Sequence, residues 1–204
     1  LKRIFDPPGA DARWKARALI YYVIYAGAMR VSEAANLRLG RFDRDQGTLF
    51  IRRSKFGKDR LLPLRPRVLE RLRHHCEDHR AGAPPEAPIF VTTAGQPYTS
   101  NSLAGHFIYD LRRLGIYRPT REEDGVRYGS PRTHSLRHTF AVQRLLMWYR
   151  ESADVMAKLP LLATYMGHSD LMYTQVYLRV TGLLLREAHE RFVGRWEKQF
   201  PLSP

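Results

Sequence analysis

The chain has 204 residues, enough for one domain with a sizeable core, and it carries 34 Lys and Arg against 20 Asp and Glu. The formal charge of +14 (34 − 20) favours a polyanionic partner, and nucleic acid is the leading one. A hydrophobic content of 44% argues against a disordered basic tail. A basic ribosomal protein or a membrane-surface protein is the alternative that charge alone leaves open.

The single cysteine and the apolar pattern restrict the compartment. Cys76 is the only cysteine, which excludes an internal disulfide and a cysteine-based zinc site. The first residues lack the apolar core of a signal peptide, and the longest apolar run, residues 18–29, is shorter than the roughly 20 residues that cross a bilayer. We therefore expect a cytoplasmic protein without membrane association. The chain starts without Met, and we expect it to be a fragment of something longer.

The residue pattern predicts a mainly α fold with one small antiparallel β-sheet (α+β). In chain order, residues 11–29 are typical of a mostly buried helix, and residues 32–37 of a short helix with Ser32 as its N-cap. Residues 48–53 and 60–64 alternate as two strands, and the turn at 56–59 joins them into a hairpin.

The second half of the chain predicts further helices. Pro66 opens a helix to about residue 79, residues 81–88 form a Gly/Pro loop, residues 101–114 a helix and residues 115–131 a charged loop. Thr133 can cap a helix from 134 to about 148, and Pro160 starts a short helix that Gly167 ends. Residues 170–177 are helical or extended, and residues 181–200 form an amphipathic helix.

Two segments carry residues suited to a phosphate group. His134 and Arg137 lie three apart on the predicted helix, where they share a face. Arginine offers a planar fork for two phosphate oxygens, and neutral histidine can accept a proton. Arg30 ends an apolar helix, and Glu33 can be its partner or orient it toward a phosphate. The alternatives are a solvated face for the first pair and a helix-end cation for Arg30.

Lysines and tyrosines supply the candidate acid and nucleophile. Lys55 lies near the hairpin tip, where it can donate a proton to a leaving group; alternatively Lys55, Lys58 and Arg60 only contact a nucleic-acid backbone. Tyr177 has a phenol with a pKa of about 10, which needs neighbouring cations or a base to become a nucleophile. Tyr173 lies four residues earlier on the same helical face, and chemistry alone does not choose between the two tyrosines.

Together these segments resemble the tyrosine recombinase (phage integrase) family. Its catalytic order is Arg, a hairpin Lys, His-x-x-Arg, a His or Trp after Gly, and a Tyr nine residues later. The corresponding residues here are Arg30, Lys55, His134, Arg137, His168 after Gly167, and Tyr177. The stretch from Lys55 to Pro63 also resembles the family's Lys…Lys-x-Arg-x-x-Pro hairpin. The spacing of the family selects Tyr177 over Tyr173.

The resemblance implies a reaction and a role for each residue. A tyrosine hydroxyl attacks a phosphodiester of double-stranded DNA and forms a 3′-phosphotyrosyl bond, without cofactor or metal. Two arginines and a histidine hold the phosphate oxygens, a lysine protonates the 5′-oxygen and a second histidine exchanges the tyrosine proton. By this resemblance, Arg30, Arg137 and His168 hold the phosphate oxygens, and Lys55 protonates the 5′-oxygen. His134 exchanges the tyrosine proton, and Tyr177 is the nucleophile. Glu33 would orient Arg30, and DNA contacts are expected at Arg53, Lys58, Arg60 and Arg132.

The resemblance also implies an organisation. Residues 1–204 correspond to the catalytic domain, and the N-terminal core-binding domain of the family is not in this chain. Residues 147–154 are extra material that is more similar to a transposon- or plasmid-associated branch. A tetramer on synapsed DNA is expected, with the helix at 181–200 as its candidate interface. The competing functions are a type IB topoisomerase and a DNA-binding protein on a degenerate recombinase fold.

Overall fold

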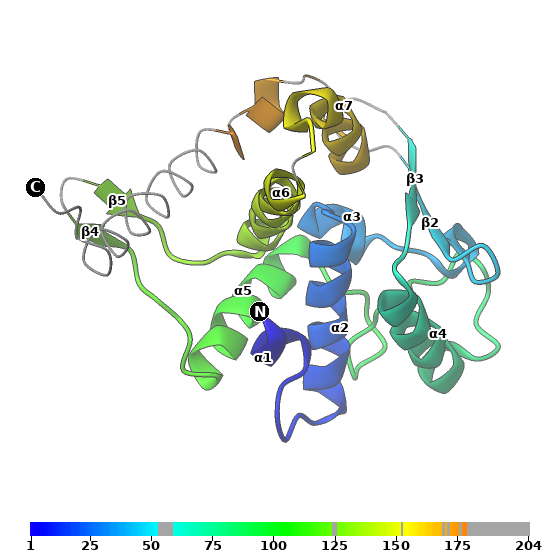
Figure 1. Ribbon diagram of the computed structural model, residues 1–204. Helices are drawn as coiled ribbons and strands as arrows, with labels where there is room; N and C mark the ends of the chain where they lie inside the picture. The colour runs from blue at the N-terminus through cyan, green and yellow to red at the C-terminus, as the bar shows by residue number, and fades with distance from the viewer. Residues whose placement is uncertain are drawn as a thin grey trace, which may run out of the picture. The chain divides into compact units, whose positions relative to one another are not determined.

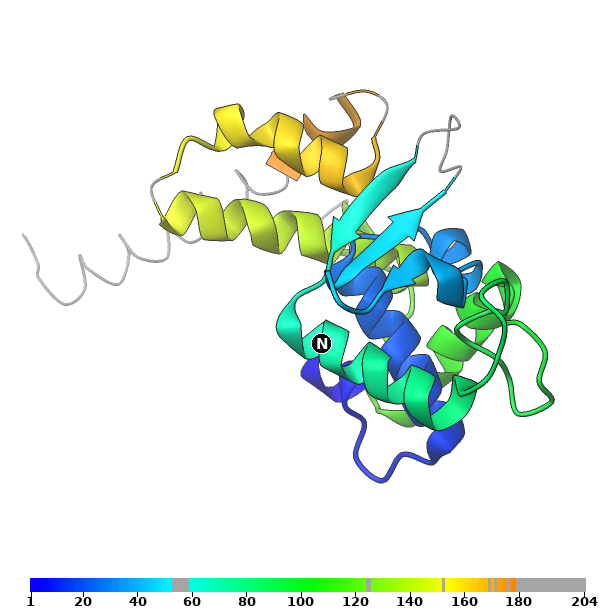
Figure 2. The same cartoon turned by 90° about the vertical axis from the view of Figure 1, so that its right-hand side faces the viewer.

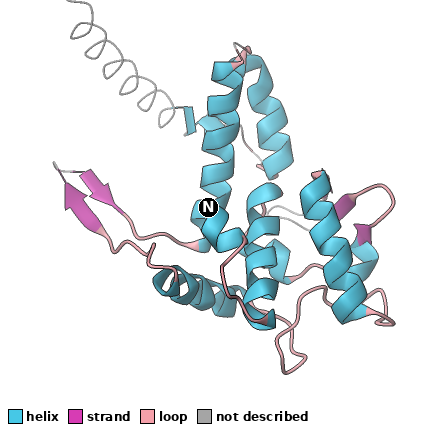
Figure 3. Cartoon of the chain, turned by 60° about the horizontal axis from the view of Figure 1, so that its bottom comes forward, coloured by secondary structure: helices cyan, strands magenta, loops and turns pink. Residues whose placement is uncertain are grey.

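The computed structural model describes residues 1–52, 59–123, 126–151, 153–168, 170, 172–175 and 177–178. Over these residues the chain is mainly helical with two small antiparallel sheets, which confirms the predicted fold class (Figure 3). The elements are α1 (Lys2–Phe5), α2 (Ala12–Ala26), α3 (Val31–Ala35), the 3-10 helix η1 (Leu39–Arg41), β1 (Phe42–Asp43), β2 (Thr48–Ile51), β3 (Arg60–Pro63), α4 (Pro66–Arg80), α5 (Ser100–Arg113), β4 (Arg121–Glu123), β5 (Val126–Tyr128), α6 (Thr133–Arg150) and α7 (Val155–Met166).

The described chain divides into two compact units. The first unit contains Leu1–Phe140 and Tyr165–Gly167, and the second contains Ala141–Thr164 and the described residues from His168 onward. The Gly/Pro loop at residues 81–88 therefore lies inside the first unit and does not separate the two.

The first unit is built around α2. The side chain of Asp11 accepts a hydrogen bond from the Trp14 backbone N–H and so starts the helix. Its apolar side chains are buried on most sides, because α1, α4 and α5 all pack against it (Figure 1). Residues that the helix buries include Ile20, Val23 and Ile24. The predicted helix at residues 11–29 is therefore confirmed, except that it ends at Ala26.

A buried ion pair joins α2 to α5. The Arg17 guanidinium donates to both carboxylate oxygens of Asp110 at 2.8 and 2.7 Å, and the Tyr21 hydroxyl donates to the same carboxylate at 2.9 Å. Asp110 is fully buried, so its charge requires these partners. The three bonds tie together two helices that are far apart in the sequence.

The three-stranded sheet has the order β1-β2-β3, all antiparallel (Figure 2). The strands confirm the predicted hairpin at both sides of its turn, and β1 is an addition that the sequence did not indicate. Leu49 and Leu62 are paired and buried, whereas Leu61 is exposed. Because side chains alternate between the faces of a strand, Arg60 shares the inward face of Leu62. The register thus directs a charged side chain into the unit.

Two predictions on helix starts are wrong, for reasons of capping. α3 begins at Val31 with Arg30 as its N-cap, instead of Ser32, because the Glu33 carboxylate accepts the Arg30 backbone N–H at 2.8 Å. α7 begins at Val155 and contains Pro160, which was expected to start it. Asp154 fixes the earlier start, since its carboxylate accepts the Ala157 backbone N–H at 3.0 Å.

The prediction of a loop at residues 115–131 is wrong in part. β4 and β5 pair antiparallel within it, with Glu122 opposite Arg127. The side chains of β4 are all exposed, so the apolar alternation that marks a half-buried strand is missing. α6 begins at Thr133, one residue before the expected start.

The second unit contains a pair of antiparallel helices. The C-terminal half of α6 and α7 lie side by side (Figures 2 and 3). Leu145, Leu159 and Leu162 are buried, and the Lys158 ammonium lies 5.6 Å from the centre of the Trp148 ring. Beyond α7, residues 172–175 and 177–178 are helical. None of the helices described is long and apolar enough to cross a membrane. The expected helix at 181–200 lies outside the described residues.

Candidate active site

The turn that follows α2 prepares the site in the first unit. The Ala28 N–H bonds to the Tyr25 carbonyl and the Met29 N–H to the Ile24 carbonyl, the pattern of a Schellman turn. Ala28 takes the left-handed position of this turn, with φ 46°, where glycine is the usual residue. The turn brings Arg30 to the start of α3 and leaves the Ala28 carbonyl as an acceptor for a side chain of another helix.

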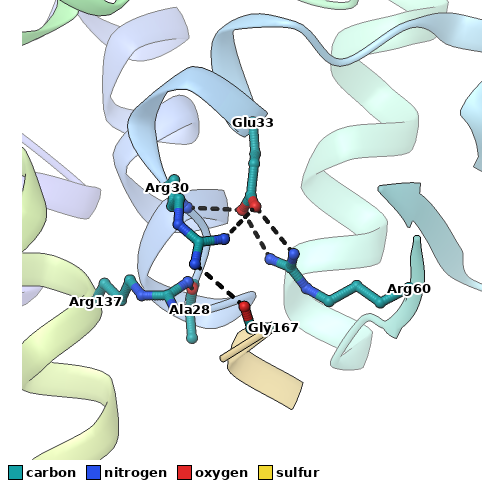
Figure 4. Close-up of polar contacts among 6 residues, drawn as sticks. All are labelled: Ala28, Arg30, Glu33, Arg60, Arg137 and Gly167. Carbon is teal, nitrogen blue, oxygen red and sulfur yellow. Dashed lines mark hydrogen bonds and ion pairs between the residues drawn. The ribbon is translucent and has the colours of Figure 1, made fainter. Parts of the chain in front are cut away.

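Glu33 is the centre of the site, and it holds two arginines (Figure 4). Its carboxylate accepts four hydrogen bonds. Arg30 donates from its backbone N–H at 2.8 Å and from Nη1 at 2.9 Å, and Arg60 donates from Nη1 at 2.9 Å and from Nη2 at 2.7 Å. Burial disfavours the charged form of Glu33, but the bonds from Arg60 and Arg30 outweigh it and lower its pKa. Glu33 is therefore an anion between two cations.

Arg30 is the open member of this cluster. Its side chain is 22% exposed, compared with 8% for Arg60 and 6% for Glu33. Its Nη2 also donates to the Gly167 carbonyl at 3.1 Å. Gly167 ends α7 with φ +67°, and a β-carbon there would lie 2.7 Å from Nη1 of Arg60. The cluster thus carries one net positive charge, and its accessible part is the Arg30 guanidinium.

Arg137 approaches the same turn from α6. Its Nη1 donates to the Ala28 carbonyl, and the residue is 1% exposed. Figure 4 shows the guanidinium groups of Arg137 and Arg30 directed to the same region beside Ala28. Two arginines that converge in a partly buried place favour the binding of an anion, because like charges repel and a buried charge is costly without a counter-charge.

His134 lies one turn before Arg137 on α6. Partial burial lowers its pKa, and the charges of His138, Arg137 and Arg30 lower it further, to about 4. The rings of His134 and His138 meet edge to face, with centroids 4.4 Å apart. His134 is therefore neutral at pH 7 and able to accept a proton.

The second unit contains the remaining two candidate catalytic residues, His168 and Tyr177, close to each other. Nδ1 of His168 lies 2.7 Å from the Thr174 hydroxyl, and both His168 and Tyr177 belong to this unit. The His168 ring is stacked on the Tyr177 ring, with centroids 6.4 Å apart, and meets the Tyr173 ring at 6.2 Å. Tyr177 is buried, and Tyr173 is exposed. The residue chosen from family spacing is thus the one stacked on the histidine.

Of the four residues expected to contact DNA, the structure describes Arg60 and Arg132. Arg53, Lys55 and Lys58 lie outside the described residues. Arg132 is exposed at the start of α6, whereas Arg60 is held by Glu33. The motifs of the sequence do not indicate this pairing or the approach of Gly167, although the alternation of the strand at 60–64 places Arg60 on the inward face. Among the residues described, no three His, Cys, Asp or Glu side chains group as a metal site.

The comparisons with known proteins identify the family. The sequence matches the phage integrase family over residues 3–182, and the chain belongs to this family. It is 32% identical over 208 residues to y4rB of Sinorhizobium fredii, named as an integrase/recombinase, covering 97% of this chain and 63% of the relative. It is 30% identical to the tyrosine recombinase XerA of Thermococcus kodakarensis, covering 87% of this chain and 55% of the relative. The chain thus spans less than two thirds of either relative.

Solved structures show the same fold. A crystal structure of XerA recombinase matches 99% of this chain and 63% of its own, with a TM-score of 0.68 and 20% identity. XerH recombinase in a post-cleavage complex with its palindromic difH substrate matches 92% of this chain and 49% of its own, with a TM-score of 0.66 and 22% identity. The Tn1549 transposon integrase bound to transposon right end DNA matches 94% of this chain and 64% of its own, with a TM-score of 0.65 and 16% identity. At these identities the likeness concerns the fold.

Proposed function

We propose that this chain is the catalytic domain, residues 1–204, of a site-specific DNA recombinase or integrase that cleaves and rejoins strands through a 3′-phosphotyrosyl bond at Tyr177. The observation that carries the proposal is the pair of arginines. Arg30 and Arg137 come from segments 107 residues apart (137 − 30), yet the guanidinium of Arg30, bonded to Glu33 and Gly167, and that of Arg137, bonded to the Ala28 carbonyl, meet near the neutral His134. This arrangement supplies cations and a proton acceptor around one phosphate.

The arginines would act on the phosphate itself. Attack on a phosphodiester puts more negative charge on the non-bridging oxygens as the pentacovalent state forms. Arg30 and Arg137 are held in place before the reaction, so their charge stabilises that state without reorganisation. His168 adds a hydrogen bond to the phosphate in this scheme, and its bond with Thr174 fixes the ring.

Proton transfer balances the two bonds that change. The Tyr177 oxygen forms a bond to phosphorus and gives its proton to His134, while the bond from phosphorus to the 5′-oxygen breaks and Lys55 protonates that oxygen. In the second half, the 5′-hydroxyl of another strand gives its proton to Lys55 and forms the bond to phosphorus, while the bond from phosphorus to Tyr177 breaks and Tyr177 recovers its proton from His134. The phosphotyrosyl bond keeps the energy of the phosphodiester, so rejoining needs no further energy source.

The charge and the relatives support the proposed partners. A formal charge of +14 favours double-stranded DNA, and we assign DNA contacts to Arg53, Lys58 and Arg132. The solved structure of XerH is bound to its difH substrate, and that of the Tn1549 integrase is a complex with transposon right end DNA. Strand exchange joins two duplexes, so we propose a homotetramer on synapsed DNA, with residues 181–200 as the contact between protomers. We also propose that the protein acts in the cytoplasm.

The test is the capture of the covalent intermediate. The protein is incubated with a pool of nicked duplexes that are randomised upstream of the nick, and complexes resistant to denaturant are recovered and sequenced. Tyr177→Phe should abolish the covalent complex and leave DNA affinity nearly unchanged, because it removes one hydroxyl and no charge. Tyr173→Phe is the matched control and should retain the complex. Loss of the complex with Tyr173→Phe alone would show that the nucleophile is wrongly assigned.

Strand exchange separates recombination from relaxation. The recovered sequence is placed twice in one DNA molecule, and the products are analysed after incubation with the protein. A recombinase exchanges the flanking segments between the two copies, whereas a type IB topoisomerase only relaxes supercoils.

A further inference from the structure

Arg60 is buried in the cluster around Glu33. Its side chain is 8% exposed, and two of its nitrogen atoms are used in the paired bonds to Glu33. Both Nη atoms of Arg60 are therefore occupied by Glu33, whereas Arg67, on the first turn of α4, is exposed. The geometry therefore separates Arg60 from the cations that contact a nucleic-acid backbone.

The bonds to Glu33 explain what Arg60 does for Arg30. An ionised carboxylate has about four acceptor positions, and Glu33 accepts four hydrogen bonds. If Arg60 were absent, both oxygens could turn to the Arg30 side chain and form a paired fork with it. Such a pair would rotate the Arg30 guanidinium and neutralise it. Arg60 occupies one edge of the carboxylate, so Arg30 binds through one side-chain nitrogen and keeps its charge for a phosphate.

Gly167 closes the cluster from the other side. Its carbonyl accepts a hydrogen bond from Nη2 of Arg30, while its α-carbon lies against the Arg60 guanidinium. A β-carbon at this position would lie 2.7 Å from Nη1 of Arg60, which is too close, and 3.1 Å from Cζ, which is tight. The glycine therefore lets Arg60 reach Glu33 and lets Arg30 bond to the end of α7.

We propose that Arg60 is a positioning residue of the phosphate site, which orients Arg30 by holding Glu33 and packing against Gly167. The inference rests on the proposed function, because it assigns Arg30 to the phosphate. It replaces the expectation that Arg60 contacts DNA. Arg60 is also the first residue of β3, so the same contact ties this strand to Arg30.

The first experiment compares cleavage with binding for Arg60→Gln. Cleavage of the recovered nicked duplex should slow by about 10²-fold, the cost of misplacing a group by roughly 1 Å. Affinity for DNA and its salt dependence should not change, whereas loss of a phosphate contact would reduce the slope by about 0.9. Arg67→Gln is the control for the loss of one charge and should cleave at the normal rate. A reduced slope for Arg60→Gln would overturn the proposal.

A second variant and an altered substrate exclude a purely structural role. Arg60 and Glu33 act as one unit here, so Glu33→Gln with Arg60→Gln should be no slower than the slower single variant. Replacing a non-bridging oxygen of the scissile phosphate by methyl removes the charge that Arg30 stabilises. The defect of Arg60→Gln should shrink several-fold on this methylphosphonate duplex. Equal defects on both substrates, or multiplied losses in the double variant, would contradict the proposal.

A measurement without DNA keeps this inference separate from the proposed function. In the intact protein, the bonds of Arg30 to Glu33 and Gly167 should restrict its guanidinium, so that nitrogen NMR resolves separate Nη signals. Arg60→Gln should move these signals to new positions, because the Arg30 guanidinium rotates into the fork with Glu33, and Arg67→Gln should not. If the unaltered protein cleaves no duplex but the signals move in Arg60→Gln, the proposed function fails and the positioning role stands. If the signals do not change, the positioning role fails.

Discussion

Gly167 offers a sharp test of the cluster because the chain contains a matched control. Gly167 directly follows the last residue of α7, and Gly115 lies two residues after the last residue of α5, with φ of +67° and +65°. Each is followed by an N–H bonded back into its helix, from His168 to the Ala163 carbonyl and from Ile116 to the Leu111 carbonyl, both within 3.0 Å. The two positions differ in their surroundings, since a β-carbon at Gly115 would meet nothing within 4 Å.

The expected cost of alanine differs accordingly. At both positions the left-handed conformation costs alanine about 1–2 kcal/mol, partly offset by about 0.4–1 kcal/mol from the less flexible unfolded chain. At Gly167 the new methyl also displaces the Arg60 guanidinium, a flexible group that can move only by giving up a bond to Glu33. Loss of one charged hydrogen bond costs about 1.5–3 kcal/mol. We expect a loss of roughly 1 kcal/mol for Gly115→Ala and roughly 2–4 kcal/mol for Gly167→Ala, from the sum of these contributions.

Two measurements check this prediction. Urea unfolding gives the free energy of unfolding of each variant, and covalent-complex formation on nicked DNA gives the rate of cleavage. Gly167→Ala should slow cleavage by about 10–100-fold, since Arg30 loses its support, and Gly115→Ala should not change it. If the two variants lost the same stability and cleaved at the same rate, the claim that the close approach of Arg60 requires a glycine at position 167 would be refuted.

Four further outcomes are expected. Lys55→Ala should cleave ordinary DNA poorly and DNA with a bridging 5′-sulfur nearly normally, because a thiolate with a pKa of about 8.5 leaves without a proton; no rescue would mean that the acid lies elsewhere. Asp110→Asn should lower the free energy of unfolding by about 3–5 kcal/mol, since it leaves the Arg17 charge buried without its anion, and a loss below about 1 kcal/mol in urea unfolding would contradict this. The free energy of unfolding should fall as the pH falls from about 6.5 to about 4, because the folded pKa of His134 lies below its unfolded value, and His134→Gln should flatten that pH profile. DNA affinity should weaken steeply with salt, at about −0.9 per phosphate contact, and a flat log–log plot from filter binding would argue against a nucleic-acid partner.

Local patterns made the main helices and the hairpin predictable. The apolar spacing of residues 11–29 and 66–79 is a property of each segment, and Asp11 and Pro66 mark the starts of α2 and α4 locally. The same holds for the end of α7, because a glycine is the usual residue for a left-handed turn. β4 and β5 carry no such pattern, since a strand with exposed charged side chains resembles a loop.

The sequence by itself determined the inventory of chemical groups and their order, because residue types and family spacing are written along the chain. It selected Arg30, Arg137, His134 and Tyr177 as candidates and predicted their elements. Only the tertiary structure decided which groups meet. Glu33 binds Arg60 from 27 residues away, and Asp110 binds Arg17 from 93 residues away. The sequence suggests only Arg30 as a partner for Glu33 and none for Asp110, because burial of a charge depends on partners that only the folded chain brings to it.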